Sequence, residues 1–164
     1  MIQNIIDFGT SLPNEMGIML LSMIPVTELR AAIPIFIAKG MQPFMAYVMA
    51  VIGNLIPVPF ILALSRPIFK WMRKRKCLKR IVDALDRKIE KNKNKVLRYE
   101  FWGLALFVAI PLPGTGAWTG AFIASILDLR YKKALPSIGI GVVTAGLIIT
   151  LISSGVFAGL KFIF

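Results

Sequence analysis

The chain contains no histidine, and only one of its 164 residues, Cys77, is a cysteine. A catalytic triad built on histidine, a histidine-ligated haem and a mixed histidine–cysteine zinc site are therefore excluded, and no internal disulfide can form. No pairing of a nucleophile with a base stands out in the sequence. We therefore expect a protein that is not an enzyme and that needs no metal or cofactor.

Acidic residues are also scarce, since 8 Asp and Glu stand against 20 Lys and Arg. Of these basic residues, 14 lie between Arg66 and Arg98, where three acids leave a net charge of +11. On a soluble protein such a charge would suggest a nucleic-acid partner. Here the basic stretch separates hydrophobic blocks, so membrane topology and anionic lipid headgroups explain it better, and we expect no nucleic acid.

Long apolar blocks make up most of the remaining chain, which is 57% hydrophobic with a mean hydropathy of +0.73. Four blocks can be delimited, at 16–38, 43–65, 101–127 and 134–162. The second block, and the fourth as far as Leu160, carry no charge and are long enough to span a bilayer. Proline or glycine interrupts the first and third blocks. We expect one membrane domain over residues 1–164, and no secretory signal peptide, because the first 29 residues contain no Lys or Arg.

The two interrupted blocks resemble each other at an offset of 86 residues. At this offset Ile24-Pro25 falls on Ile110-Pro111, Ala31 on Ala117, Phe36-Ile37-Ala38 on Phe122-Ile123-Ala124, and Gly53 on Gly139. Duplicated hydrophobic segments that are broken by proline or glycine are the best sequence indication of a transporter's binding site.

Charge decides between two topologies. If all four blocks spanned, the basic stretch and the second basic loop, 128–133, would lie on opposite sides, against the positive-inside rule. If 16–38 and 101–127 are re-entrant hairpins, both basic loops are cytoplasmic and both termini lie outside. Their arms of about ten residues, or about 15 Å, reach halfway across the hydrocarbon core.

The predicted fold is therefore an all-α membrane protein with two inverted-topology repeats. Each repeat is a re-entrant helical hairpin followed by a transmembrane helix, and a basic amphipathic cytoplasmic helix lies between them over 66–98. Four ordinary spans with proline kinks remain the alternative.

Two ionisable residues, Glu28 and Arg30, lie well inside a hydrophobic block, where charges are costly and mark functional sites. Arg30 could bind an anion such as phosphate, and Glu28 could carry a proton; alternatively, the two neutralise each other as a structural pair. Non-helical backbone at membrane depth must line a cavity or be buried, so the hairpin tips should meet near the midplane. The other expected substrate contacts are Thr27, Asn54, Pro113, Gly114, Thr115, Gly116, Trp118 and Thr119.

The segment Pro25-Val26-Thr27-Glu28-Leu29-Arg30-Ala31-Ala32-Ile33-Pro34, with Pro111-Leu112-Pro113-Gly114-Thr115-Gly116-Ala117-Trp118-Thr119-Gly120-Ala121 downstream, resembles the small multidrug export protein family of prokaryotes. That family is in turn similar to the DedA/VTT superfamily. The resemblance implies a prokaryotic inner membrane, paired re-entrant hairpins and movement of lipids such as polyprenyl phosphates, with the superfamily's acidic hairpin residue at Glu28. Its second hairpin usually carries arginines, whereas the stretch from Val108 to Gly120 has none.

Three functions stay open. The first is a flippase-like transporter of an anionic lipid such as a polyprenyl phosphate, which Arg30 beside Glu28 favours. The second is proton-coupled export of small molecules through Glu28, and the third is a membrane scaffold that transports nothing. Besides membrane lipids and the substrate, we expect a second copy of the chain as partner, because two hairpins and two helices form a thin wall around a site.

Overall fold

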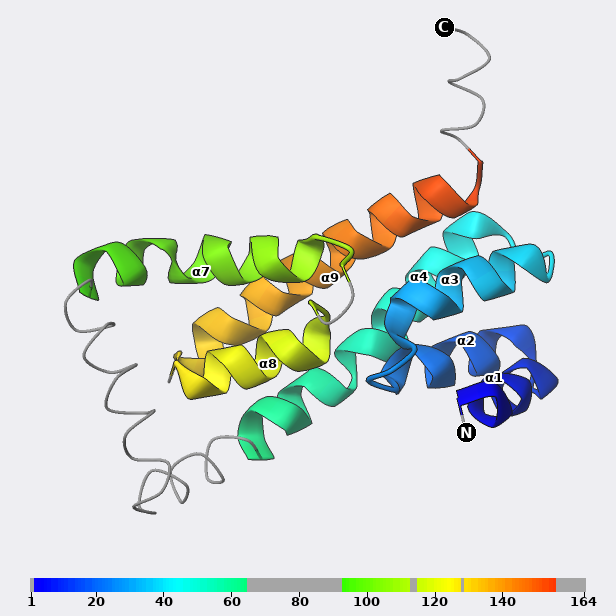
Figure 1. The fold of residues 1–164 in the computed structure, drawn as a ribbon, viewed down its shortest axis with the longest axis horizontal. Coiled ribbons are helices and arrows are strands. Elements are labelled where there is room, and N and C mark those ends of the chain that lie inside the picture. The colour runs from blue at the N-terminus through cyan, green and yellow to red at the C-terminus, as the bar shows by residue number, and fades with distance from the viewer. Residues whose placement is uncertain (1, 65–92, 113–114, 128, 156–164) are drawn as a thin grey trace, which may run out of the picture.

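In the computed structural model all regular secondary structure is helical among the residues that it describes, which are 2–64, 93–112, 115–127 and 129–155 (Figure 1). The helices in these ranges are α1 (Ile2–Ser11), α2 (Asn14–Met23), α3 (Glu28–Ala38), α4 (Pro43–Leu55), α7 (Lys93–Ala109), α8 (Ala117–Ile126) and α9 (Tyr131–Ser153). The basic helix expected over 66–98 lies outside the described residues except for 93–98, which form the start of α7.

Two of the described helices are long and apolar enough to cross a membrane, as expected for the second and fourth blocks. The first extends over Pro43–Leu64 and consists of α4, a break at Ile56 and the helical residues 57–64. The break directly precedes Pro57, which has no N–H to donate to the helix. The second is α9, with 23 residues. At 1.5 Å per residue both are about 33 to 35 Å long, enough for a hydrocarbon core of roughly 30 Å.

Two pairs of shorter helices flank the long ones. Residues 24–27 join α2 to α3, and residues 110–116 join α7 to α8. We call the first pair hairpin one and the second pair hairpin two. Figure 1 shows that the two pairs approach from opposite ends of the molecule with their turns facing each other, and that α4 and α9 run in opposite directions between them.

In each half the first arm of the hairpin packs tightly against the long helix that follows it. A Cβ on Gly53 of α4 would lie 2.5 Å from the carbonyl oxygen of Met19 in α2. A Cβ on Gly141 of α9 would lie 2.7 Å from the carbonyl oxygen of Ala105 in α7. Both contacts therefore require glycine, which lets helix backbones approach closely.

The 86-residue offset holds for the first arms but is wrong for the long helices. It pairs Gly53 with Gly139, yet a Cβ on Gly139 would meet nothing within 4 Å, and Gly141 makes the equivalent contact. The helices α2 and α7 end 86 residues apart, whereas α4 and α9 begin 88 residues apart. The register changes because the turn of hairpin two is three residues longer than that of hairpin one, while α8 is one residue shorter than α3.

The core lies where α3, α4 and α9 pack together, and its small side chains allow the close packing. It includes the buried residues Ala32, Ile33, Phe36, Ala46, Ala50, Ile138, Val142 and Ala145. Many large apolar side chains instead lie exposed on the outside, among them Phe44, Phe60, Trp102, Leu106, Leu147 and Ile152. Apolar surface on this scale is typical of a face that contacts lipid rather than water.

The short helix α1 was not expected from the sequence. It packs on α2, where a Cβ on Gly17 would lie 2.2 Å from the carbonyl oxygen of Gly9. Its last turn is also held by Lys39, whose Nζ donates a hydrogen bond of 2.6 Å to the carbonyl oxygen of Thr10. The N-terminal segment is therefore tied to both arms of hairpin one.

Candidate functional site

The turns of the two hairpins are joined by Arg30, the third residue of α3. Its Nη1 donates to the carbonyl oxygen of Leu112 at 2.8 Å, and its Nη2 donates to that of Ile110 at 3.2 Å. Nη2 also donates, at 3.5 Å, to the carbonyl oxygen of Val108 in the last turn of α7, where backbone acceptors have no partner inside the helix and the helix dipole is negative. Arg30 of hairpin one thus satisfies the C-terminal end of the first arm of hairpin two.

Thr115 completes this contact from within hairpin two. Its Oγ1 accepts a hydrogen bond of 3.0 Å from Arg30 Nη2. The same hydroxyl lies 2.6 Å from the carbonyl oxygen of Ile110 and 2.9 Å from that of Leu112, so it can donate to one of them. The turn is therefore folded around the guanidinium group. The neighbouring candidates Pro113 and Gly114 lie outside the described residues.

Glu28 holds the opposite helix end of the same hairpin. Its carboxylate accepts the backbone N–H of Trp118 in the first turn of α8. A Cβ on Gly116, the residue before α8, would lie 1.7 Å from Oε2 of Glu28, so the carboxylate occupies the space that a side chain would need. Oε2 also lies 3.6 Å from Nη1 of Arg30. The negative charge faces the positive end of α8, while Arg30 faces the negative end of α7.

The backbone at Glu28 is itself strained. Of the described residues other than glycine, Glu28 alone has a positive φ, at 46°. This left-handed conformation costs about 1–2 kcal/mol in a residue with a Cβ. The preceding residue, Thr27, is buried and fixes the turn by donating from Oγ1 to the carbonyl oxygen of Leu21. Strain of this kind is concentrated at functional sites.

Trp118 makes the reciprocal contact from hairpin two to hairpin one. Its indole Nε1 donates a hydrogen bond of 3.0 Å to the carbonyl oxygen of Met23, the last residue of α2. Both donors lie in the first turn of a second arm, Arg30 as the third residue of α3 and Trp118 as the second residue of α8. Each second arm thus satisfies carbonyl groups at the end of the other hairpin's first arm.

A cavity of about 410 Å³ lies between the two turns. Five of the residues that line this cavity were expected from the sequence: Thr27, Glu28, Arg30, Gly116 and Thr119. The sequence reasoning missed four others, Pro25, Val26, Ala31 and Pro111. Two of these, Pro25 and Pro111, belong to the repeated Ile-Pro pair, so the repeat already contained the signal that could have found them.

Asn54 of α4 lies behind the cavity rather than on its wall. It shares a narrow gap with Glu28 and Arg30, and the gap has no room for a water molecule. The Asn54 side chain is 1% exposed, and its Oδ1 has no hydrogen-bond partner. Nε of Arg30 is likewise buried without a partner. Asn54 is therefore close to Glu28 and Arg30 but does not line the cavity between the two turns.

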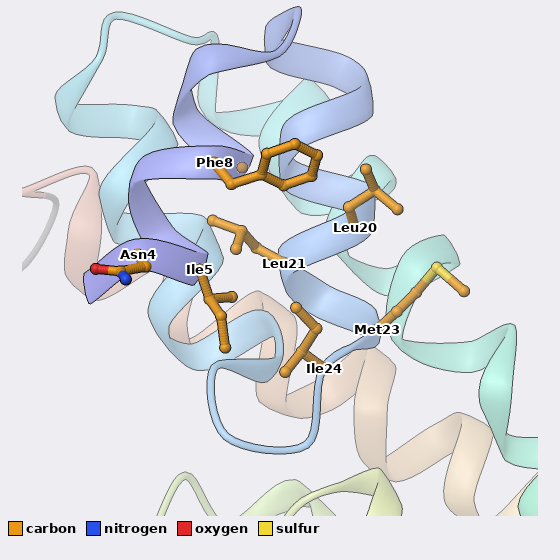
Figure 2. A pocket seen from close by; sticks show the side chains of 8 residues that line it. Asn4, Ile5, Phe8, Leu20, Leu21, Met23 and Ile24 are labelled. Carbon is orange, nitrogen blue, oxygen red and sulfur yellow. The ribbon is translucent and has the colours of Figure 1, made fainter. Parts of the chain in front are cut away.

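A second cavity, of about 470 Å³, lies between α1 and α2 (Figure 2). Its walls are apolar apart from Asn4 and consist otherwise of Ile5, Phe8, Gly9, Leu20, Leu21, Met23 and Ile24. None of these side chains titrates, so this groove lacks the chemistry to hold a charged group. The cavity between the turns remains the candidate site.

Of the comparisons with known proteins, the scan against family models gives a match. No curated protein and no solved structure matches the chain. A family model described as "Putative small multi-drug export protein" matches residues 28–148. The matched range begins at Glu28 and includes Arg30, Asn54, the turn of hairpin two and both helices long enough to span a membrane. Because the match covers most of the chain, this membrane protein belongs to the putative small multi-drug export protein family.

Proposed function

We propose that the protein is a transporter that moves an amphiphile with an anionic headgroup, such as a polyprenyl phosphate, through the cavity between the two turns. One observation carries this proposal: Arg30 lines that cavity at the junction of the two hairpins. The guanidinium group stays bonded to hairpin two but places its positive charge on the cavity wall, where it attracts phosphate oxygens, and Thr119 adds a hydroxyl group to the same wall.

The arrangement of the helices supports a transport architecture. The hairpins approach from opposite ends, the long helices are antiparallel, and each half has one glycine contact between its first arm and its long helix. We infer that the hairpins are re-entrant halves of an inverted repeat that meet near the bilayer midplane, where non-helical backbone must line a cavity or be buried. The basic segment 66–98 is then cytoplasmic, both termini lie outside, and a second copy of the chain completes the wall.

Proton-coupled export of small molecules is the second candidate. It is favoured by the Glu28 carboxylate on the cavity wall and by the description of the family. Acidic residues inside membrane domains commonly act in proton relays. A scaffold without transport is the third candidate, because Glu28 and Arg30 both hold hairpin two and could serve that purpose alone.

The proposal can be tested in proteoliposomes with a fluorescent phosphatidic acid, whose phosphate monoester headgroup resembles that of a polyprenyl phosphate. Phosphatidylcholine with the same label is the control lipid. Arg30→Lys keeps the charge but loses the planar group that holds the turn of hairpin two beside the cavity, so transport of phosphatidic acid should fall about tenfold or more. Thr119→Val should weaken transport less, whereas Thr144→Val, on α9 away from the cavity, should leave it unchanged.

Each other outcome selects another function. If the folded wild type moves neither lipid but expels ethidium, and Glu28→Gln abolishes the efflux, the second candidate replaces the first. If it moves none of these compounds, and a cellular phenotype survives both Glu28→Gln and Arg30→Lys, the scaffold explains the protein.

A further inference from the structure

The buried amide of Asn54 has no role in the contacts between the hairpins. We propose that its Oδ1 is the hydrogen-bond acceptor for the protonated carboxyl group of Glu28. The carboxyl group then has two positions, one on the N-terminus of α8 when it is charged and one at Asn54 when it is protonated. This inference rests on the proposed function of the cavity, and it adds how binding of the substrate anion is linked to protonation of Glu28.

The first step of the argument is that Oδ1 of Asn54 lacks a partner in a place where it should have one. The side chain is 1% exposed, and buried polar atoms are nearly always hydrogen-bonded because leaving one unpaired is costly. Water in the gap that Asn54 lines does not supply the partner, since this gap has no room for a water molecule. We therefore look for the donor among the side chains that line the gap with Asn54.

The second step is to ask which side chains could donate. Apart from Asn54, the gap is lined by two polar side chains, Glu28 and Arg30, and otherwise by Leu29, Val108, Gly116, Ala117, Val142 and Ala145. Arg30 is held by its Nη atoms at the end of α7, and its Nε makes no bond to Asn54. Glu28 becomes a donor as soon as its carboxyl group takes up a proton.

The third step concerns the charges around Glu28. Among the described residues of the packed elements, Arg30 is the one charged group that faces its carboxylate. The helices α4 and α8 carry no charged residue, and the charged residues of α2, α7 and α9 lie in the half of each helix away from the turns. Protonation of Glu28 therefore breaks one ion pair and leaves Arg30 with the carbonyl groups of hairpin two.

The consequence is competition at the N-terminus of α8. In the structure the Glu28 carboxylate accepts the backbone N–H of Trp118 and sits on Gly116, where an anionic headgroup would also bind. When the protonated carboxyl group turns to Asn54, that N–H and the guanidinium of Arg30 face the cavity. Binding of one anion is thus coupled to uptake of one proton.

The test is infrared difference spectroscopy of the full-length protein in lipid, with ¹³C-labelled glutamate, during a pH titration without substrate. Wild type should show a C=O band of a protonated carboxyl group that is lost in Glu28→Gln. In Asn54→Leu this band should move to higher wavenumber, and its pH midpoint should fall by about one unit, the worth of one hydrogen bond. Ser22→Ala, which removes another buried unpartnered oxygen away from the gap, is the control and should change neither.

Two further variants keep the test decisive if Asn54→Leu does not fold. Asn54→Ser retains a hydrogen-bond acceptor, so the C=O band of Glu28 should move less than it does in Asn54→Leu. Gly116→Ala should raise the pH midpoint of this band, because its Cβ expels the charged carboxylate from α8. The inference would be overturned if the Glu28 band of wild type stayed unmoved in every Asn54 variant, or if wild type showed no Glu28 band. Either result would count even if transport is normal. A band that responds as expected in a protein that transports nothing would instead reject the proposed function alone.

Discussion

Hairpin one contributes both charges of the site, whereas hairpin two contributes the two helix ends that these charges hold. The backbone geometry of the halves is otherwise similar, since each first arm meets its long helix at a glycine. The difference is concentrated at the start of the second arms, where α3 carries Glu28 and Arg30 while α8 carries Ala117 and Trp118. The comparison teaches that the two halves share a close helix contact at glycine but differ in chemistry, because the two hairpins bind each other and so need complementary residues.

The turns differ in backbone conformation as well. Glu28, the first residue of α3, has a positive φ, which normally favours glycine, while Gly116, the residue before α8, has an ordinary φ of −76°. Gly116 is needed for a different reason, since the Glu28 carboxylate fills its Cβ space. The strained residue therefore lies in hairpin one and the glycine that accommodates its side chain lies in hairpin two.

The largest effect on this comparison is expected from Arg30→Ala. The substitution leaves the end of α7 without its donor and Glu28 as a buried charge without its partner, which costs about 3–5 kcal/mol of stability. Thermal unfolding in detergent micelles, together with limited proteolysis at 110–116, measures the loss. The double variant Arg30→Ala/Glu28→Gln should recover part of it. A wild-type melting temperature for Arg30→Ala would show that the hairpins are held by other contacts.

A smaller effect, of the same size in both halves, is expected from alanine at the contact glycines. Gly53→Ala and Gly141→Ala each place a Cβ closer than 3.0 Å to backbone atoms of the first arm, so we expect a loss of about 1–3 kcal/mol. Gly139→Ala is the matched control on the same helix as Gly141, and it should stabilise the protein by about 0.5–1 kcal/mol. If Gly139→Ala lowered the unfolding temperature and Gly141→Ala did not, the 86-residue offset would hold for the long helices as well.

The smallest effect is expected from Trp118→Phe. Phenylalanine keeps most of the ring but removes the indole donor, so the carbonyl group of Met23 loses one hydrogen bond, worth about 0.5–1.5 kcal/mol. Hydrogen exchange at the end of α2 should increase, while exchange at the end of α7, which Arg30 holds, should not. Equal changes at both ends would mean that Trp118 acts by packing and not through its hydrogen bond.

The sequence predicted the order of elements well, because proline, glycine and charge mark where apolar blocks stop. Both long helices lie where uncharged blocks were found, and Glu28 and Gly116 line the same cavity. The helix α1 was missed although Ile2, Ile5 and Ile6 follow helical spacing, because the segment has only ten residues and precedes the first long apolar block. The re-entrant topology, the relationship to the DedA/VTT superfamily and the basic helix over 66–98 stay predictions.

The partners of the site could not have been predicted. Arg30 binds backbone carbonyl groups, which every residue has, so no sequence pattern identifies Leu112 or Ile110 as its acceptors. The same is true of Met23 as the acceptor of Trp118. The register change also escapes a fixed-offset comparison, because it depends on the lengths of two turns and not on which residues they contain.

The separation of Arg30 from its acceptors along the chain has a consequence for synthesis. Arg30 and the carbonyl group of Leu112 are 82 residues apart, so the charged turn is made long before the helix ends that it binds. At about 5–20 residues per second, roughly 4–16 s pass before those ends leave the ribosome. During that time the first hairpin carries a charge pair without its other partners, and it must be sheltered from lipid by the insertion machinery or wait at the membrane surface. The order of translation thus makes the second half of the chain a requirement for settling the first half into the bilayer.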